Sequence, residues 1–126
     1  MDWTESERER QAAALAGGTV VANMRKGTDD GLVAWAKEHG RFVYIGRHAR
    51  GGWKESVWCN PFREGKHGDR AAIMAAYREH LEHSPALKAR LGELRGQVLG
   101  CWCHPEPCHG DILCEFVNDA PHQAAE

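Results

Sequence analysis

The chain has 126 residues and a mass of 14.0 kDa, which is the size of a single domain. Its hydrophobic content of 42% is enough for a core without a disulfide scaffold, and no apolar run approaches the roughly 20 residues that span a bilayer. A formal net charge of −2 excludes a protein that coats nucleic acid through charge alone. Five cysteines and a start without a long apolar segment predict a reduced, cytoplasmic setting with no membrane partner.

The first third of the chain predicts helices that alternate with strands. Residues 1–18 form a charge-rich helical extension, which we expect to fray or to face a partner. Residues 18–24 are apolar and β-branched, which predicts a strand. Residues 29–40 place apolar side chains at helical spacing and end in glycine. Residues 41–47 are apolar on both faces, which is typical of a strand in the middle of a covered sheet.

A long basic loop follows at residues 46–68. It is rich in glycine and contains Trp53, Trp58 and Phe62, and loops of this length in a small domain are usually functional or disordered. The aromatic residues favour function. Residues 41–70 carry seven Lys and Arg against three Asp and Glu, which suits a small anionic ligand or a short nucleic-acid contact. A solvated polar loop is the alternative.

The second half predicts the remaining elements. Asp69 is a helix N-cap, and Ser84 followed by proline begins another helix. Residues 97–103 form a strand and residues 110–119 a last helix. Together the elements predict a single α/β domain over residues 19–118, with a small, mainly parallel sheet flanked by helices. Residues 119–126 are expected to be a flexible tail.

Residues 101–111, "CWCHPEPCHGD", combine soft ligands with titratable groups. On a strand, Cys101 and Cys103 would share one face, while Trp102 would face away and join the core. Cys108 can return to the same point after the turn between the prolines. We therefore expect a tetrahedral Zn²⁺ site, with an iron–sulfur cluster as the weaker alternative. Its ligands would be Cys101, Cys103, Cys108 and His109, or His104 in place of His109.

Two other interpretations of this segment stay open. Cys108 at a helix N-terminus could be a thiolate nucleophile, with His109 or His104 as base and Asp111 orienting the imidazole. A phosphatase-type loop is excluded because Cys114, rather than arginine, stands six residues after Cys108. The other interpretation is purely structural: the cysteines pack in the core and Asp111 caps the helix.

The segments "VYIGR", "NPF" and "LGCWCHPEPCHGDIL" resemble an uncharacterised family of bacteria and their phages, known only as a domain of unknown function. The resemblance covers residues 19–117. It departs from the family pattern at Cys59 and Cys114, which we expect to pack, and residues 29–40 look like an insertion. The resemblance implies a site without naming a reaction. Its motif positions are Tyr44, Gly46, Arg47, Asn60, Pro61, Phe62, Cys101, Cys103, Cys108, His109, Gly110 and Asp111.

We expect an enzyme, a hydrolase or transferase, that acts on a nucleotide, a nucleoside or a related phosphorylated small molecule. Arg47 would anchor the anion, Asn60 would orient the substrate, and Gly110 would let the anion approach the helix N-terminus. Tyr44 and Gly46 would complete the binding site, with aromatic rings available for stacking. The catalytic candidates are Asp111, His109 and Cys108. The alternatives are a non-catalytic zinc-stapled module that binds nucleic acid or protein, and a thiol redox protein.

Overall fold

The centre of the fold is a three-stranded parallel sheet. The computed structural model describes residues 3–49, 52–104 and 106–118. The strands are β1 (Val20–Asn23), β2 (Phe42–Tyr44) and β3 (Val98–Cys101), in the order β1-β3-β2. The expected α/β class with a small parallel sheet is confirmed. The flexible tail that the sequence predicts at residues 119–126 lies outside the described residues.

The expectation that the second strand lies in the middle of the sheet is wrong. All four residues of β3 are buried, whereas β2 is an edge strand whose residues are half-buried. Part of the apolar surface of β2 is covered instead by the ring of Trp53, which belongs to the following loop. Trp53 lies 4.8 Å from the Tyr44 ring and 5.9 Å from the Phe42 ring, measured between centroids. An edge strand covered by a loop thus has the same sequence pattern as a central one.

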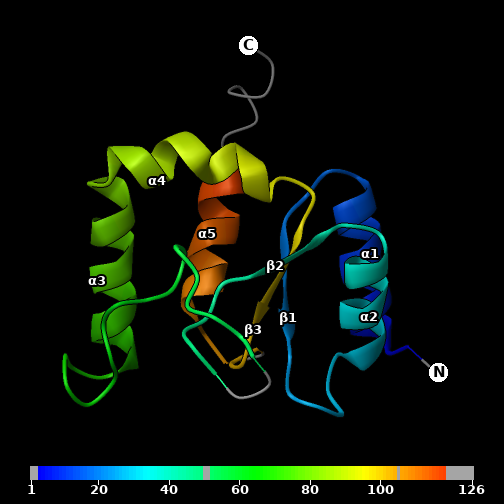
Figure 1. Cartoon of the computed structure of the whole chain (residues 1–126), viewed down its shortest axis with the longest axis horizontal. Helices are drawn as coiled ribbons and strands as arrows, with labels where there is room; N and C mark the ends of the chain where they lie inside the picture. Colours follow the sequence, from blue (N-terminus) through cyan, green and yellow to red (C-terminus); the bar gives the residue numbers. More distant parts are fainter. Residues whose placement is uncertain (1–2, 50–51, 105, 119–126) are drawn as a thin grey trace.

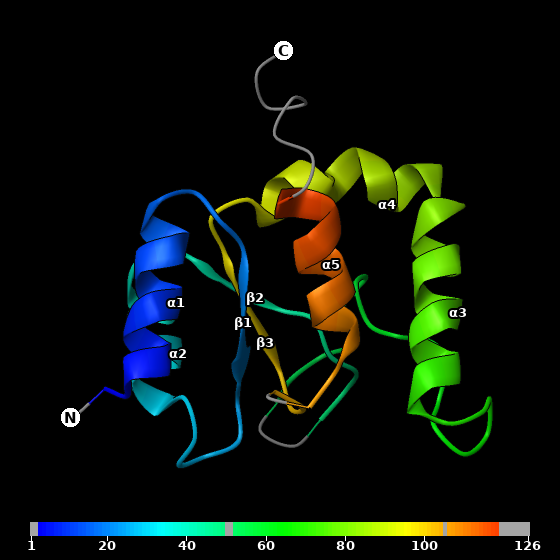
Figure 2. The ribbon, with the colours of Figure 1, turned by 180° about the vertical axis from the view of Figure 1, so that it is seen from behind.

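Helices cover both faces of the sheet (Figures 1 and 2). On one face lie α1 (Glu5–Leu15) and α2 (Asp30–Glu38). On the other face lies α5 (His109–Asn118), with α3 (Arg70–Glu82) packed against it. The chain passes from α3 to β3 through α4 (Pro85–Arg90) and the 3₁₀ helix η1 (Leu91–Leu94). The expected caps are confirmed: Asp69 accepts from the N–H of Ala72 at 2.9 Å, and Ser84 accepts from that of Leu87 at 3.3 Å.

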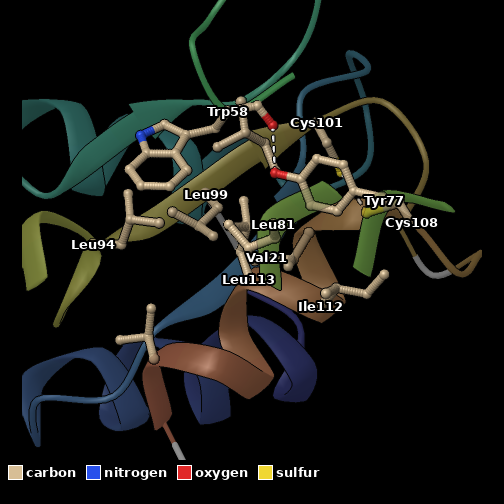
Figure 3. Packing of buried hydrophobic residues seen from close by; sticks show 12 residues of the cluster. Val21, Trp58, Tyr77, Leu81, Leu94, Leu99, Cys101, Cys108, Ile112 and Leu113 are labelled. Carbon is tan, nitrogen blue, oxygen red and sulfur yellow. Dashed lines mark hydrogen bonds between the residues drawn. The ribbon is translucent and has the colours of Figure 1, made fainter. Parts of the chain in front are cut away.

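Strand alternation divides the core into two layers. Val21 and Leu99 point toward α5, whereas Ala22 and Val98 point toward α1 and α2. The larger layer also contains Tyr77, which is fully buried and donates its hydroxyl to the carbonyl of Trp58 at 2.8 Å (Figure 3). This bond ties the long loop after β2 to α3. The core is thereby connected to the basic loop at residues 46–68, which the sequence marks as functional.

Helix α1 is an integrated part of the fold rather than a frayed or partner-facing extension. Its capping box joins Thr4 to Glu7, and the second carboxylate oxygen of Glu7 accepts from the N–H of Leu32 at 2.9 Å, in the first turn of α2. Arg10 binds Asp29 through two hydrogen bonds of 2.8 and 2.9 Å. The charged residues that suggested a frayed or partner-facing helix therefore hold the start of α2. None of the helices in the described residues is long and apolar enough to cross a membrane.

Replacing Asp29 by asparagine should remove a pH-dependent part of the stability. Burial raises the pKa of Asp29, but the hydrogen bonds from Arg10 and from the Asn23 N–H, together with the charge of Arg10, outweigh burial and hold the pKa below its ordinary value of 3.8. A carboxyl whose pKa is lowered on folding stabilises the fold above its unfolded pKa, so this contribution is complete above about pH 4 and is lost as the pH falls further.

Urea unfolding of the wild type and Asp29→Asn between about pH 6 and about pH 3 tests this expectation. The variant should be less stable by about 3 kcal/mol at the upper end, because the Arg10 charge loses its buried partner. The gap should narrow at the lower end. Glu115→Gln, which breaks an exposed ion pair, is the control and should have little effect. A gap for Asp29→Asn that is constant with pH would contradict the argument.

Candidate functional site

A cavity of about 290 Å³ lies at the carboxyl ends of β2 and β3. Because both strands run in the same direction, the loops that follow them meet at one edge of the sheet (Figure 1, lower part). The start of α3 closes the cavity from the side. Its lining consists of Tyr44, Gly46, Arg47, His48, Ala49, Asn60, Phe62, Glu64, Arg70, Ile73, Met74, Cys101, Trp102, Cys103, Pro107, Cys108 and His109. The two stretches singled out in the sequence therefore form one site.

Arg47 holds the loop after β2 in shape. Its Nη2 atom donates to the carbonyl of Asn60 and, at 2.8 Å, to that of Phe62. Its own carbonyl accepts from the hydroxyl of Tyr44. Gly46 permits this arrangement, because a Cβ there would lie 2.5 Å from the Tyr44 hydroxyl oxygen. Arg47, the predicted anion anchor, therefore bonds the loop through Nη2. Its Nε and Nη1 atoms have no acceptor among the described residues.

Asn60 presents its amide to the cavity. The residue is only 8% exposed, and its Oδ1 accepts from the N–H of Phe62 at 2.9 Å. Its Nδ2 has no acceptor among the described residues. Since no fully buried side-chain nitrogen or oxygen of these residues lacks a hydrogen-bond partner, Nδ2 must retain solvent contact, and Asn60 is a lining residue. The predicted role of Asn60 as a donor to a ligand is compatible with this placement.

Three polar contacts fix the segment that follows β3. Asn23, at the end of β1, donates its side-chain amide to the carbonyl of His104. Arg70, the first residue of α3, donates from Nη1 to the carbonyl of Pro107 at 2.6 Å. The carboxylate of Asp111 accepts from the N–H of Cys108 at 3.0 Å. The segment that carries the thiols is therefore held from three different elements.

The structure gives several predicted site residues a different position. Asp111 is exposed, lies outside the cavity lining and caps α5. A Cβ on Gly110 would lie 2.9 Å from Cδ1 of Ile45 and 3.0 Å from Cγ2 of Val21, so this glycine lets α5 approach the sheet. Trp102 lines the cavity and donates its Nε1–H to Tyr44 at 3.0 Å, so the expectation that it faces away is wrong. Strand alternation does not reach Trp102, because β3 ends at Cys101.

Two cysteine thiols are in contact in the lining of the cavity, and a third cysteine, Cys103, also lines it. Sγ of Cys101 lies 3.4 Å from Sγ of Cys108, and both residues are buried (Figure 3). Hydrogen bonds from these two thiols, followed by the hydrogen bond and charge of Arg70, lower the pKa of the half-buried Cys103 thiol. Hydrogen bonding to Cys101 and then to Cys103 raises the pKa of the Cys108 thiol, and hydrogen bonding to Cys103 raises that of the Cys101 thiol. One cysteine of the three is therefore favoured as the thiolate.

Cys59 and Cys114 lie outside the cavity lining, as expected of packing residues. Burial raises the pKa of the Cys114 thiol to about 12. Burial and, next, the charge of Glu55 raise the pKa of the Cys59 thiol. Neither side chain has the environment of a reactive thiol.

A hydrogen bond between its imidazole and a backbone carbonyl fixes the orientation of His109. Its Nε2 lies 2.7 Å from the carbonyl of Ile45, which can only accept, so Nε2 carries the proton and Nδ1 is the free acceptor. Burial lowers the pKa of the imidazole, although the Ile45 carbonyl opposes this effect. His109 is therefore a neutral base with its lone pair on Nδ1. Such an orientation by a backbone carbonyl is also usual for metal-binding histidines.

The expected zinc site stays a prediction. Within the described residues, no group of three or more His, Cys, Asp and Glu side chains is arranged to hold a metal ion. Within the proposed ligand set, the structure brings Sγ of Cys101 and Sγ of Cys108 into contact at 3.4 Å.

Arg70 is a site residue that the sequence marked only as part of the basic segment. The structure places it in the lining of the cavity, with its Nη2 atom 3.5 Å from Oε1 of Glu64. A signal was present, because a cation in the first turn of a helix opposes the helix dipole and gains little there unless it has another partner. Ile73 and Met74, which follow on α3, provide the apolar part of the lining.

Replacing Arg47 by methionine should loosen the loop after β2. The change leaves the carbonyls of Asn60 and Phe62 without their charged donor, which should lower the free energy of unfolding by about 1.5–3 kcal/mol. Urea unfolding and limited proteolysis within residues 46–62 measure the effect. Arg63→Met, an exposed arginine of the same loop, is the matched control. Equal stability of both variants would show that Arg47 does not clamp the loop.

Comparison with known proteins places the chain in a family. A segment of 55 residues is 40% identical to the "uncharacterized 12.4 kDa protein in nrdA-td intergenic region" of Enterobacteria phage T4, covering 40% of this chain and 51% of the phage protein. The match thus spans about half the length of that relative. No solved structure matches the chain significantly. Residues 33–119, more than half of the chain, match the model of a family described as a domain of unknown function, so the chain belongs to the DUF4326 family.

Proposed function

We propose that the cavity binds a small, planar anion of the nucleotide class and that the domain acts on this ligand enzymatically. The observation that carries the proposal is the meeting of two arginines and a free amide donor with aromatic rings in one cavity. This combination of charge, donors and flat apolar surface supports a phosphorylated ligand with a ring system.

The polar side of the lining favours an anion. Arg47 and Arg70 both reach the cavity, and the carboxylate among the lining residues, Glu64, already pairs with Arg70. Arg47 keeps Nε and Nη1 available, and Asn60 keeps Nδ2. Guanidinium groups suit phosphate oxygens because they offer paired donors in one plane. A phosphate or carboxylate at this end of the cavity would find complementary charge.

The apolar side of the lining favours a flat ring. Tyr44 and Trp102 are fixed to one another by a hydrogen bond of 3.0 Å, and Phe62 lies on the loop after β2. Ile73 and Met74 add aliphatic surface from α3. A volume of about 290 Å³ lies at the lower limit of ligand pockets, roughly 300–1,000 Å³. A nucleoside or mononucleotide fits this size better than a dinucleotide.

His109 is the residue that we assign to proton transfer. Its neutral imidazole lines the cavity with Nδ1 as the acceptor, which suits a general base that removes a proton from water or from a ligand hydroxyl. Asp111 supports the site instead as the cap of α5. With His109 as the base and Asp111 as a structural residue, the site can serve either hydrolysis or group transfer.

Binding can be tested with nucleoside monophosphates, the corresponding nucleosides and inorganic phosphate, by calorimetry and by the shift in melting temperature. A nucleoside monophosphate should bind more tightly than either of its parts. Arg70→Gln should weaken binding by about tenfold or more, since a hydrogen bond to a charged group contributes about 1.5–3 kcal/mol. Arg78→Gln is the matched control, because Arg78 lies on the same helix but pairs with Glu115 on the surface.

Equal binding by the two arginine variants would contradict the assignment of the cavity. Tighter, salt-sensitive binding of oligonucleotides than of mononucleotides would favour the alternative, a nucleic-acid binding module. If binding is confirmed, His109→Gln should retain the ligand and abolish turnover of the nucleotide that binds. Turnover that survives this change would refute the assignment of the base.

A further inference from the structure

Glu64 is the one carboxylate among the described residues that line the cavity. It lies on the long loop after β2, between Phe62 and the start of α3. The Glu64 side chain is 53% exposed, whereas Asn60 is 8% exposed, so Glu64 lies nearer the mouth of the cavity than Asn60 does. Neither the binding of an anion nor the proton transfer assigned to His109 uses this carboxylate.

The contact between Glu64 and Arg70 leaves the carboxylate able to bind a ligand. Oε1 of Glu64 lies 3.5 Å from Nη2 of Arg70, beyond the roughly 2.7–2.9 Å of a charge-assisted hydrogen bond. Arg70 itself is anchored through Nη1 to the carbonyl of Pro107 at 2.6 Å. Among the described residues, Oε2 of Glu64 has no hydrogen-bond donor. Arg70 therefore balances the charge of Glu64 without occupying its oxygens.

In a nucleotide, the sugar is the part that a carboxylate at this position suits best. A phosphate offers acceptors, as a carboxylate does, and like charges repel at short range. The flat rings that would hold a base, Tyr44 and Trp102, belong to the strand ends, whereas Glu64 lies beside the first residue of α3. Ribose hydroxyls are donors, and acidic side chains bind them in dinucleotide-binding folds. The two oxygens of one carboxylate match the two neighbouring hydroxyls of a ribose.

We propose that Glu64 accepts hydrogen bonds from the ribose hydroxyls of the ligand, so that the cavity selects ribonucleotides over 2′-deoxyribonucleotides. This inference rests on the proposed function, because it identifies the sugar of the nucleotide-class ligand. Arg70 serves both parts of the ligand: its charge attracts the phosphate and keeps Glu64 from repelling it.

The exposure of Glu64 sets the size of the selection. A fully buried site that bonds a hydroxyl rejects the analogue without it by about 10⁴-fold or more, because its polar group is then left unpaired. Water can reach the half-exposed Glu64 and replace a missing hydroxyl. We therefore expect a preference for the ribonucleotide of about tenfold, the lower end of the effect of a hydrogen bond to a charged group.

The first test uses the unaltered protein and calorimetry. The four ribonucleoside 5′-monophosphates are compared with their 2′-deoxy counterparts, base by base. Each nucleotide that binds should do so about tenfold more tightly in its ribose form. Equal affinity for the two sugars would overturn the assignment of Glu64 and leave the nucleotide-class ligand in place. Binding of neither sugar form would refute the proposed function, and the sugar assignment with it.

The second test replaces Glu64 by glutamine, which keeps its size and removes its charge. Loss of a negative charge by itself should tighten the binding of any anion. Weaker binding of the ribonucleotide alone therefore reports a direct contact with the sugar. Glu64→Gln should lower the affinity for the ribonucleotide by about tenfold and that for the deoxyribonucleotide much less, so that the preference largely disappears.

Glu55→Gln is the matched control, because Glu55 is an exposed carboxylate of the same loop that lies outside the lining. It should keep the preference of the wild type, and urea unfolding should show equal stability of both variants, since both side chains are exposed. An unchanged preference in Glu64→Gln would refute the contact with the sugar. Tighter binding of both sugar forms would also contradict it, and would show that Glu64 competes with the ligand for Arg70.

Discussion

The parallel pairing of β3 between β1 and β2 is the constraint on which the rest of this structure depends. Because all three strands point the same way, the segments that leave them arrive at one edge of the sheet. The loop after β2 and the segment after β3 are separated in the sequence by α3, α4, η1 and β3, yet they form the walls of one cavity. The end of β1 takes part as well, since Asn23 binds the carbonyl of His104. A site made from such distant segments exists only when the strands pair in this order.

Hydrogen bonds from polar side chains fix the conformation of the loops around the cavity. Arg47 gathers the carbonyls of the loop after β2, and Arg70 and Asp111 hold the thiol segment from two helices. Glycine takes part by its small size: Gly46 leaves room for the Tyr44 ring, and Gly110 lets α5 lie against the sheet. A chain of contacts even reaches α1, because Arg10 binds Asp29, which accepts from the N–H of Asn23. The geometry of the site therefore depends on contacts that extend from α1 to the segment after β3.

The motif residues divide into those that shape the site and those that face it. Asp111 and Gly110 shape it, and Arg47 does so with one nitrogen while keeping others available. Asn60, His109 and Cys103 face the cavity with a free donor, a free acceptor and an accessible sulfur. Short motifs rich in polar residues tend to mix these roles, since a loop must satisfy its own backbone groups before it can bind anything. Assigning chemistry to every motif residue therefore overestimates the catalytic set.

The sequence by itself determined the fold class, the helix starts at Asp69 and Ser84, and the two stretches that form the site, because periodicity, caps and residue chemistry are local properties. The tertiary structure decided the central position of β3, the place of Trp102 in the cavity, the supporting role of Asp111, and the part played by Arg70. These depend on which segments become neighbours. Strand order, the residue at which a strand ends, and the acceptor that a side chain finds are set by packing between distant parts of the chain, which local pattern does not encode.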